Sequence, residues 1–144
     1  MPNSRKQHCD SSDCPLAHTL DIVGDKWTLI IIRDMAVCNK HEYKEFMESP
    51  EGISTNILAD RLKKLEHEKI IKSIPHPQYK TRKLYYLTAA GKEFIHVLSA
   101  LVKWGGEHLD GVTRQSDEDD GNCVVELFEN LASWEKEYLG EIIQ

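Results

Sequence analysis

The sequence predicts a mainly α-helical fold that carries one small β-hairpin, an α+β class, on two observations. First, apolar residues recur at i, i+4 and i+7 within residues 54–68, which is the spacing of one buried helix face, and Ser54 stands where an N-cap belongs. The residues of this stripe are Leu58, Leu62 and Leu65. Second, residues 70–74 and 83–87 alternate or are rich in aromatic and branched side chains around a turn-rich segment, which is typical of a hairpin.

The helix face opposite the apolar stripe is polar and partly basic. At about 100° per residue, this face holds Asn56, Ala59, Asp60, Lys63 and His67, with Lys64 beside them. Residues 54–83 contain eight basic and three acidic residues, a local charge of +5, although the whole chain carries −6. In a winged helix, one such helix enters the DNA major groove and the hairpin lies along the neighbouring backbone. The sequence therefore predicts a winged helix-turn-helix.

Length and composition fit one soluble globular domain, with 144 residues, 40% hydrophobic and 29% charged. No apolar run approaches the roughly 20 residues that cross a bilayer, and no apolar segment follows the basic N-terminus, so we expect no membrane partner and a cytoplasmic location. Four irregularly spaced cysteines are then expected to be thiols. We expect no enzyme, metal or cofactor, because phosphate-loop, nucleophile-elbow, HExxH and Cys-x-x-Cys motifs are all absent.

Three helices are expected before residue 54, over residues 15–23, 26–37 and 43–48. Residues 1–13 are polar without periodicity and are expected to form a flexible N-terminal arm. Pro15 suits a first helical position, which makes Cys14 the N-cap of a helix that Gly24 closes. Asp25 can cap the second helix, whose branched residues also permit a strand but whose length favours a helix. The third helix, a turn and the helix described above form a helix-turn-helix.

After the hairpin, one long helix over residues 89–109 is expected, with Thr88 as its cap and an interruption at the Gly105–Gly106 pair. The segments beyond the domain are an acidic linker over 109–122 and an amphipathic C-terminal helix over 123–144. From Glu107 to the end, eleven acidic residues stand against two basic ones. We expect this part to face away from DNA.

Four fragments of the chain resemble the HxlR-type family of bacterial transcriptional regulators: CPLAHTLDIVGDKWTLIIIRDM, EYKEFMESPEGISTNILADRLKKLEHEKII, RKLYYLTAAGKEF and VKWGGEH. The resemblance covers residues 14–108. It implies a homodimeric winged helix-turn-helix domain that binds an inverted-repeat operator in double-stranded DNA, with additional N- and C-terminal dimerisation helices. The helix over 123–144 departs from the compact family pattern, and either extends the dimer interface or folds over the protomer.

The candidate DNA-binding residues are Ser54, Thr55, Asn56, Lys63 and Lys64 in the helix and Lys80, Arg82 and Lys83 in the hairpin. Hydroxyl and backbone N–H groups at a helix start suit phosphate, and Asn56 could bond adenine bidentately. Basic hairpin residues suit the DNA backbone or minor groove. The alternative interpretation of the outer helix face is a solvent-exposed surface that binds nothing. The alternative function is a winged-helix module that binds a protein partner without sequence-specific DNA binding.

Cys14 is a second candidate site. Unpaired N–H groups at a helix N-terminus stabilise a thiolate, although the neighbouring Asp13 acts against this. The family resemblance implies a redox- or electrophile-sensing role for Cys14, and the alternative is a capping cysteine that senses nothing. A small-molecule effector of unknown identity is a further partner to consider: Trp27 and Trp104 could line a pocket for it, or they could be core or interface residues.

Overall fold

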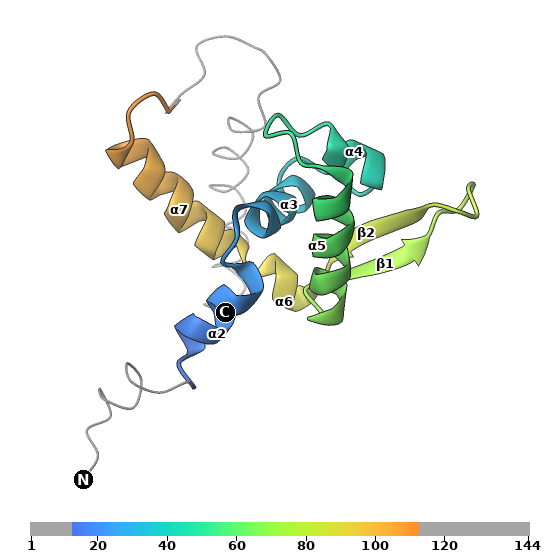
Figure 1. Ribbon diagram of the computed structural model, residues 1–144, viewed down its shortest axis with the longest axis horizontal. Coiled ribbons are helices and arrows are strands. Elements are labelled where there is room, and N and C mark those ends of the chain that lie inside the picture. The colour runs from blue at the N-terminus through green and yellow to red at the C-terminus, as the bar shows by residue number, and fades with distance from the viewer. Residues whose placement is uncertain (1–12, 113–144) are drawn as a thin grey trace, which may run out of the picture.

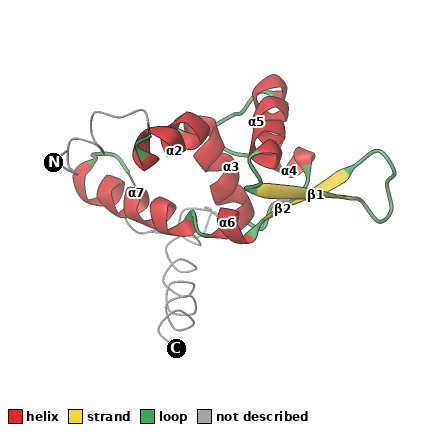
Figure 2. Ribbon diagram, turned by 90° about the horizontal axis from the view of Figure 1, so that it is seen from below, coloured by secondary structure: helices red, strands yellow, loops and turns green. Residues whose placement is uncertain are grey.

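The computed structural model describes residues 13–112 as a group of helices with one projecting hairpin (Figures 1 and 2). The elements are α2 (Pro15–Val23), α3 (Lys26–Ala36), α4 (Tyr43–Met47), α5 (Thr55–His67), β1 (Ile71–Pro75), β2 (Lys83–Leu87), α6 (Ala89–Lys92) and α7 (Ile95–His108). The mainly helical fold with one hairpin is therefore confirmed. The proposed arm up to residue 12, the linker from residue 113 and the C-terminal helix lie outside the described residues.

The predicted helix starts are confirmed. Cys14 is the N-cap of α2 with Pro15 next to it, and the Asp25 side chain accepts from the Thr28 N–H at the start of α3. Ser54 accepts from the Ile57 N–H, and Thr88 accepts from the Gly91 N–H. Asp25, Ser54 and Thr88 each satisfy a backbone donor that the first helical turn leaves unpaired, whereas Cys14 makes no side-chain cap hydrogen bond.

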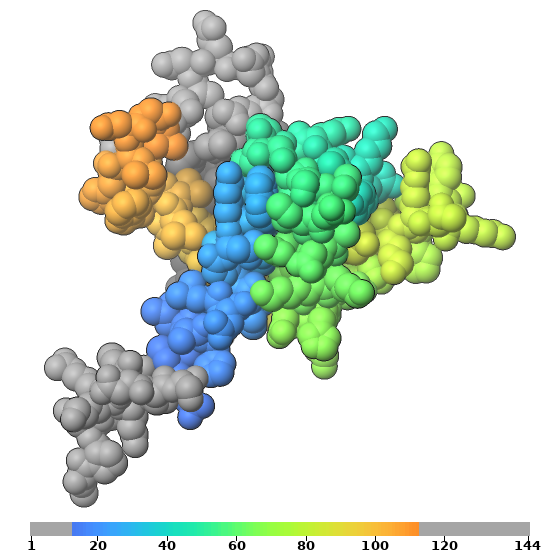
Figure 3. Space-filling view, in the orientation of Figure 1, coloured from blue at the N-terminus to red at the C-terminus, as the bar shows by residue number. Residues whose placement is uncertain are grey.

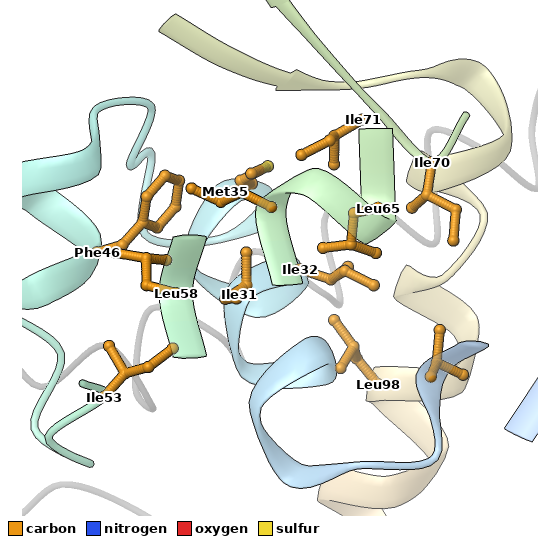
Figure 4. Packing of buried hydrophobic residues seen from close by; sticks show 12 residues of the cluster. Ile31, Ile32, Met35, Phe46, Ile53, Leu58, Leu65, Ile70, Ile71 and Leu98 are labelled. Carbon is orange, nitrogen blue, oxygen red and sulfur yellow. The ribbon is translucent and has the colours of Figure 1, made fainter. Parts of the chain in front are cut away.

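The core lies where α3, α5 and the first strand meet (Figure 4). Ile31 and Ile32 of α3 are buried, as is the predicted apolar stripe of α5. That stripe is Leu58, Leu62 and Leu65. Burial of each such side chain contributes roughly 1.5–3 kcal/mol. This burial fixes which face of α5 points outward.

The hairpin is antiparallel, with Ile71 opposite Leu87 and Ile74 opposite Leu84. Its base is anchored in the core, because Ile71 is buried. A bridge from Glu42 to Leu84 adds the segment before α4 to the outer edge of β2. The hairpin is therefore tied to the helix-turn-helix, while its tip projects away from the body (Figure 3).

The expectation of one long helix after Thr88 is wrong. The chain forms α6 and α7, separated at Glu93 and Phe94, and the Gly105–Gly106 pair lies inside α7. The break arises because the Phe94 N–H bonds to the Gly91 carbonyl, three residues back, in a tight turn. Gly91 is buried against the Ile70 backbone, where a Cβ would lie 2.1 Å from the carbonyl oxygen. The turn directs Phe94 onto the core.

One cysteine differs from expectation. Cys38, just after α3, is disulfide-bonded, so the expectation that the cysteines are thiols is wrong for this residue. The mistake has a physical cause: pairing depends on which segments approach one another in space, and irregular sequence spacing carries no such information.

Helices α2 and α7 lie on the side of the molecule away from the hairpin (Figures 1 and 2). Between residues 13 and 112, no helix combines the length and the apolar character that a membrane span requires.

Candidate nucleic-acid interface

The outer face of α5 is exposed as the sequence predicted. The side chains that reach solvent along it and at its start are Ser54, Thr55, Asn56, Ala59, Asp60, Lys63 and His67. The Ser54 hydroxyl is occupied as an acceptor by the Ile57 N–H at 3.3 Å, but its own proton remains available for donation. Five of the eight candidate DNA contacts come from this helix and its cap, and four of these five are exposed.

Lys64 is the exception among these candidates. Its ammonium group donates to the Asp21 carbonyl oxygen at 2.8 Å, and its side chain is half-buried between α5 and the end of α2. The neighbouring Lys63 is exposed. Adjacent positions on a helix differ by about 100°, which is enough to separate these two lysines.

A second contact fixes α5 against α3 through Arg61. Its Nε lies 2.8 Å from Asp25 Oδ2, and its Nη1 pairs with Asp60. Burial raises the pKa of Asp25, but hydrogen bonds from Thr28 and Arg61 outweigh burial and hold that pKa below its ordinary value of 3.8. Asp60 therefore has a protein partner in Arg61.

A buried ionic cluster holds the turn that precedes α5. The Nη2 atom of Arg33 in α3 lies 2.8 Å from Asp34 Oδ1, and its Nη1 atom lies 2.5 Å from Glu51 Oε1. The Asp34 side chain is only 1% exposed. The Ser49 hydroxyl donates to Asp34, and the ammonium group of Lys40 lies 3.6 Å from it. The hydrogen bond from Arg33 lowers the pKa of Glu51 more than burial raises it. The cluster thereby fixes where α5 begins relative to α3.

The tip of the hairpin, the wing, is an ordered turn with basic side chains. The Arg82 guanidinium lies over the Tyr79 ring, 4.4 Å from its centroid. The imidazole Nδ1 of His76 accepts from the backbone of Gln78 and Tyr79, and its Nε2 lies 2.9 Å from Glu42. The three candidate wing residues are all exposed: Lys80, Arg82 and Lys83.

A cleft of about 450 Å³ separates α4 from the wing. Its basic lining residues are Lys44, Arg82 and Lys83. Tyr43, which also lines it, donates through its hydroxyl to the Thr55 carbonyl at 2.8 Å, so the cleft adjoins the start of α5. Sequence reasoning missed Lys44. Lys44 could have been found from the sequence, because it lies between the inward-facing Tyr43 and Phe46 of a short helix. This position directs the Lys44 side chain outward.

The second candidate site and the proposed effector residues lie elsewhere. Cys14 is a free, half-buried thiol at the N-terminus of α2 with no side-chain capping hydrogen bond. Trp27 packs on the core, whereas Trp104 is 57% exposed on α7, and neither lines the two cavities described in this chain. Within residues 13–112 no three His, Cys, Asp or Glu side chains gather as a metal site would require.

Comparison with known proteins places this geometry in a family. The HxlR-like helix-turn-helix profile matches residues 22–113. An HTH-type transcriptional regulator of Synechocystis sp., sll1512, is 32% identical over 97 residues, which is 67% of this chain and 71% of that protein.

Two solved structures share the fold. The candidate transcription factor PA1607 superposes with a TM-score of 0.64 at 31% identity, covering 83% of this chain and 82% of that one. The oxidized form of the redox regulator HypR gives a TM-score of 0.59 at 27% identity, covering 67% and 99%. The chain therefore belongs to the HxlR-like helix-turn-helix family and is a transcriptional regulator of the winged-helix type.

Proposed function

We propose that the protein binds an inverted-repeat DNA operator as a homodimer, with α5 in the major groove and the wing on the adjacent backbone. The observation that carries the proposal is that the exposed polar and basic face of α5 adjoins a cleft lined by Lys44, Arg82 and Lys83. Tyr43 of this cleft donates to the Thr55 carbonyl at the start of α5. Asn56 lies in the first turn of α5, where side chains of a recognition helix reach base edges.

Exposed apolar side chains on α2 and α7 support the dimer. Leu16 and Leu20 of α2 and Val97, Leu101 and Trp104 of α7 are all exposed in the described protomer. The spacing of the α7 residues, at four and then three positions, places them on one stripe. Soluble proteins rarely leave such a patch uncovered, and a two-fold partner covers it with the same surface.

A mobility-shift titration on the DNA upstream of its own gene tests this function. Asn56→Ala should weaken selective binding by about 5–150-fold, the value of one bidentate base contact, with an unchanged salt slope. Lys63→Gln should weaken binding to every DNA. It should also lower the salt slope, the steepness with which the logarithm of the binding constant falls with the logarithm of salt concentration, by about 0.9, because one phosphate contact is lost. Lys64→Gln is the matched control, since this lysine is bonded to Asp21, and it should leave the slope unchanged.

Two outcomes would reject DNA as the partner. One is that the wild-type protein selects no sequence from its neighbourhood. The other is binding that does not weaken as salt rises, because several Lys and Arg contacts must release counterions. Either outcome would favour the winged-helix module that binds a protein.

We also propose that Cys14 makes operator binding responsive to oxidants or electrophiles. Its thiol is free and half-buried at the N-terminus of α2. Cys14 directly precedes the Leu16 and Leu20 side of the proposed dimer face. The likeness to the redox regulator HypR supports the same role.

Diamide treatment before the mobility shift tests the Cys14 role. The wild-type protein should change its operator affinity by about tenfold or more, equivalent to about 1.4 kcal/mol of coupling. Cys14→Ser should bind the operator as reduced wild-type protein does and should not respond to diamide. A response that persists in Cys14→Ser would assign sensing to another cysteine and overturn this part of the proposal.

A further inference from the structure

A second cavity, of about 490 Å³, lies between the C-terminal end of α3, the hairpin and the α6–α7 junction. Its apolar lining includes Met35, Ile74, Leu87 and Ile95. Ile74 is 44% exposed, so apolar surface inside the cavity meets solvent. The volume is within the range of about 300–1,000 Å³ typical of small-molecule sites.

Two lysines bring positive charge to this cavity. Lys72 of β1 and Lys92 of α6 both line it, and both are exposed. Within residues 13–112, neither ammonium group belongs to a salt bridge or hydrogen bond. Basic groups that border an apolar cavity without an anionic partner provide a site for an anion.

An aromatic platform forms one wall. The rings of His41 and Tyr86 are stacked with centroids 4.4 Å apart. Hydrogen bonds fix the His41 imidazole through both ring nitrogens. Its Nδ1 lies 2.9 Å from the Tyr85 carbonyl oxygen, and its Nε2 lies 2.9 Å from Asn39 Oδ1. Tyr86 stands directly opposite Lys72 in the strand register. A ring-shaped ligand could therefore stack on a preformed surface beside a cation.

We propose that this cavity binds a small organic acid with a flat apolar body. The carboxylate lies at Lys72 and Lys92, and the body lies against Tyr86 and toward Met35 and Ile95. The opposite orientation is disfavoured, because the C-terminal carbonyls of α3 carry partial negative charge beside Met35.

The position of the cavity suggests what such a ligand does. Its walls come from both strands of the hairpin and from Ile95 in the first turn of α7, the helix that carries the proposed dimer face. A ligand that contacts both would bias the orientation of the wing relative to α7. This consequence for DNA affinity rests on the proposed function, whereas binding of the acid does not.

Calorimetry and amide NMR on the full chain without DNA test the site. The probes are 2-naphthoate, benzoate and octanoate, with 2-naphthamide as the neutral analogue. We expect saturable binding of 2-naphthoate that shifts the amide signals of Tyr86 and Ile95. The double variant Lys72→Gln/Lys92→Gln should weaken 2-naphthoate by about tenfold through loss of two charge-assisted contacts, and leave 2-naphthamide unchanged.

Lys103→Gln, an exposed lysine of α7 that does not line the cavity, is the matched control and should bind 2-naphthoate like the wild type. The proposal is overturned if neither 2-naphthoate nor benzoate binds saturably at millimolar concentration, if octanoate binds as tightly as 2-naphthoate, or if the double variant binds 2-naphthoate with unchanged affinity. A mobility shift without any acid then tells whether the DNA-binding proposal stands separately.

Discussion

Replacement of Asp34 by alanine is expected to lower the free energy of unfolding by about 3–5 kcal/mol, the cost of removing one partner from a buried ion pair. Asp34 is 1% exposed and accepts hydrogen bonds from Arg33 and Ser49. Its removal leaves the half-buried Arg33 with Glu51 alone and leaves the buried Ser49 hydroxyl without its acceptor. Urea denaturation followed by circular dichroism measures the loss.

Two further variants show whether the loss comes from the cluster. Asp34→Asn keeps the shape of the side chain and one acceptor oxygen but removes the charge. Its free energy of unfolding should therefore fall between those of the wild type and Asp34→Ala. Asp60→Ala removes an exposed carboxylate that also pairs with an arginine, and should change stability by about 0.5 kcal/mol or less. If Asp34→Ala costs no more than Asp60→Ala, the cluster does not hold the turn before α5.

The second large effect concerns assembly. If the protein forms the proposed dimer, Leu101→Glu is expected to raise its dissociation constant by about 100-fold or more, because a carboxylate would be buried at an apolar interface without a partner. Leu101 is 52% exposed in the described protomer and lies between Val97 and Trp104 on α7. Analytical ultracentrifugation across a range of protein concentrations gives the constant directly.

The matched control is Lys103→Glu, which introduces the same carboxylate two positions further along α7. At about 100° per residue, this position points away from the Leu101 stripe. Lys103→Glu should therefore remain dimeric and should bind the operator. A dimeric Leu101→Glu variant would show that α7 does not form the interface, and a monomeric Lys103→Glu would show that charge alone, not the apolar stripe, controls assembly.

The sequence predicted those parts of the fold that follow from local patterns. The stripe of Leu58, Leu62 and Leu65 identified the buried face of α5, and the polar cap Ser54 identified its start, because both depend on residues less than four turns apart. The β-branched α3 was also predicted as a helix, since its length outweighed strand propensity.

The parts that escaped prediction depend on contacts between distant segments. Lys64 is turned aside by a carbonyl of α2, 43 positions away in sequence, and nothing near it signals this bond. The break before Phe94 arises where Gly91 meets the backbone of Ile70. The basic cleft beside Lys44 exists only because the hairpin lies beside the segment that leads into α4. Local periodicity carries no information about such approaches.

The contacts that tie the wing to α4 and α4 to α5 have a mechanical consequence. Glu42 holds His76 at the wing, and Tyr43 holds the Thr55 carbonyl at the start of α5. We therefore expect the wing, α4 and α5 to move together as one rigid unit. In the proposed dimer, a signal that reaches α2 or α7 would leave this unit intact in each protomer and change the distance and angle between the two units. Operator binding would then depend on whether that separation matches the pitch of the double helix.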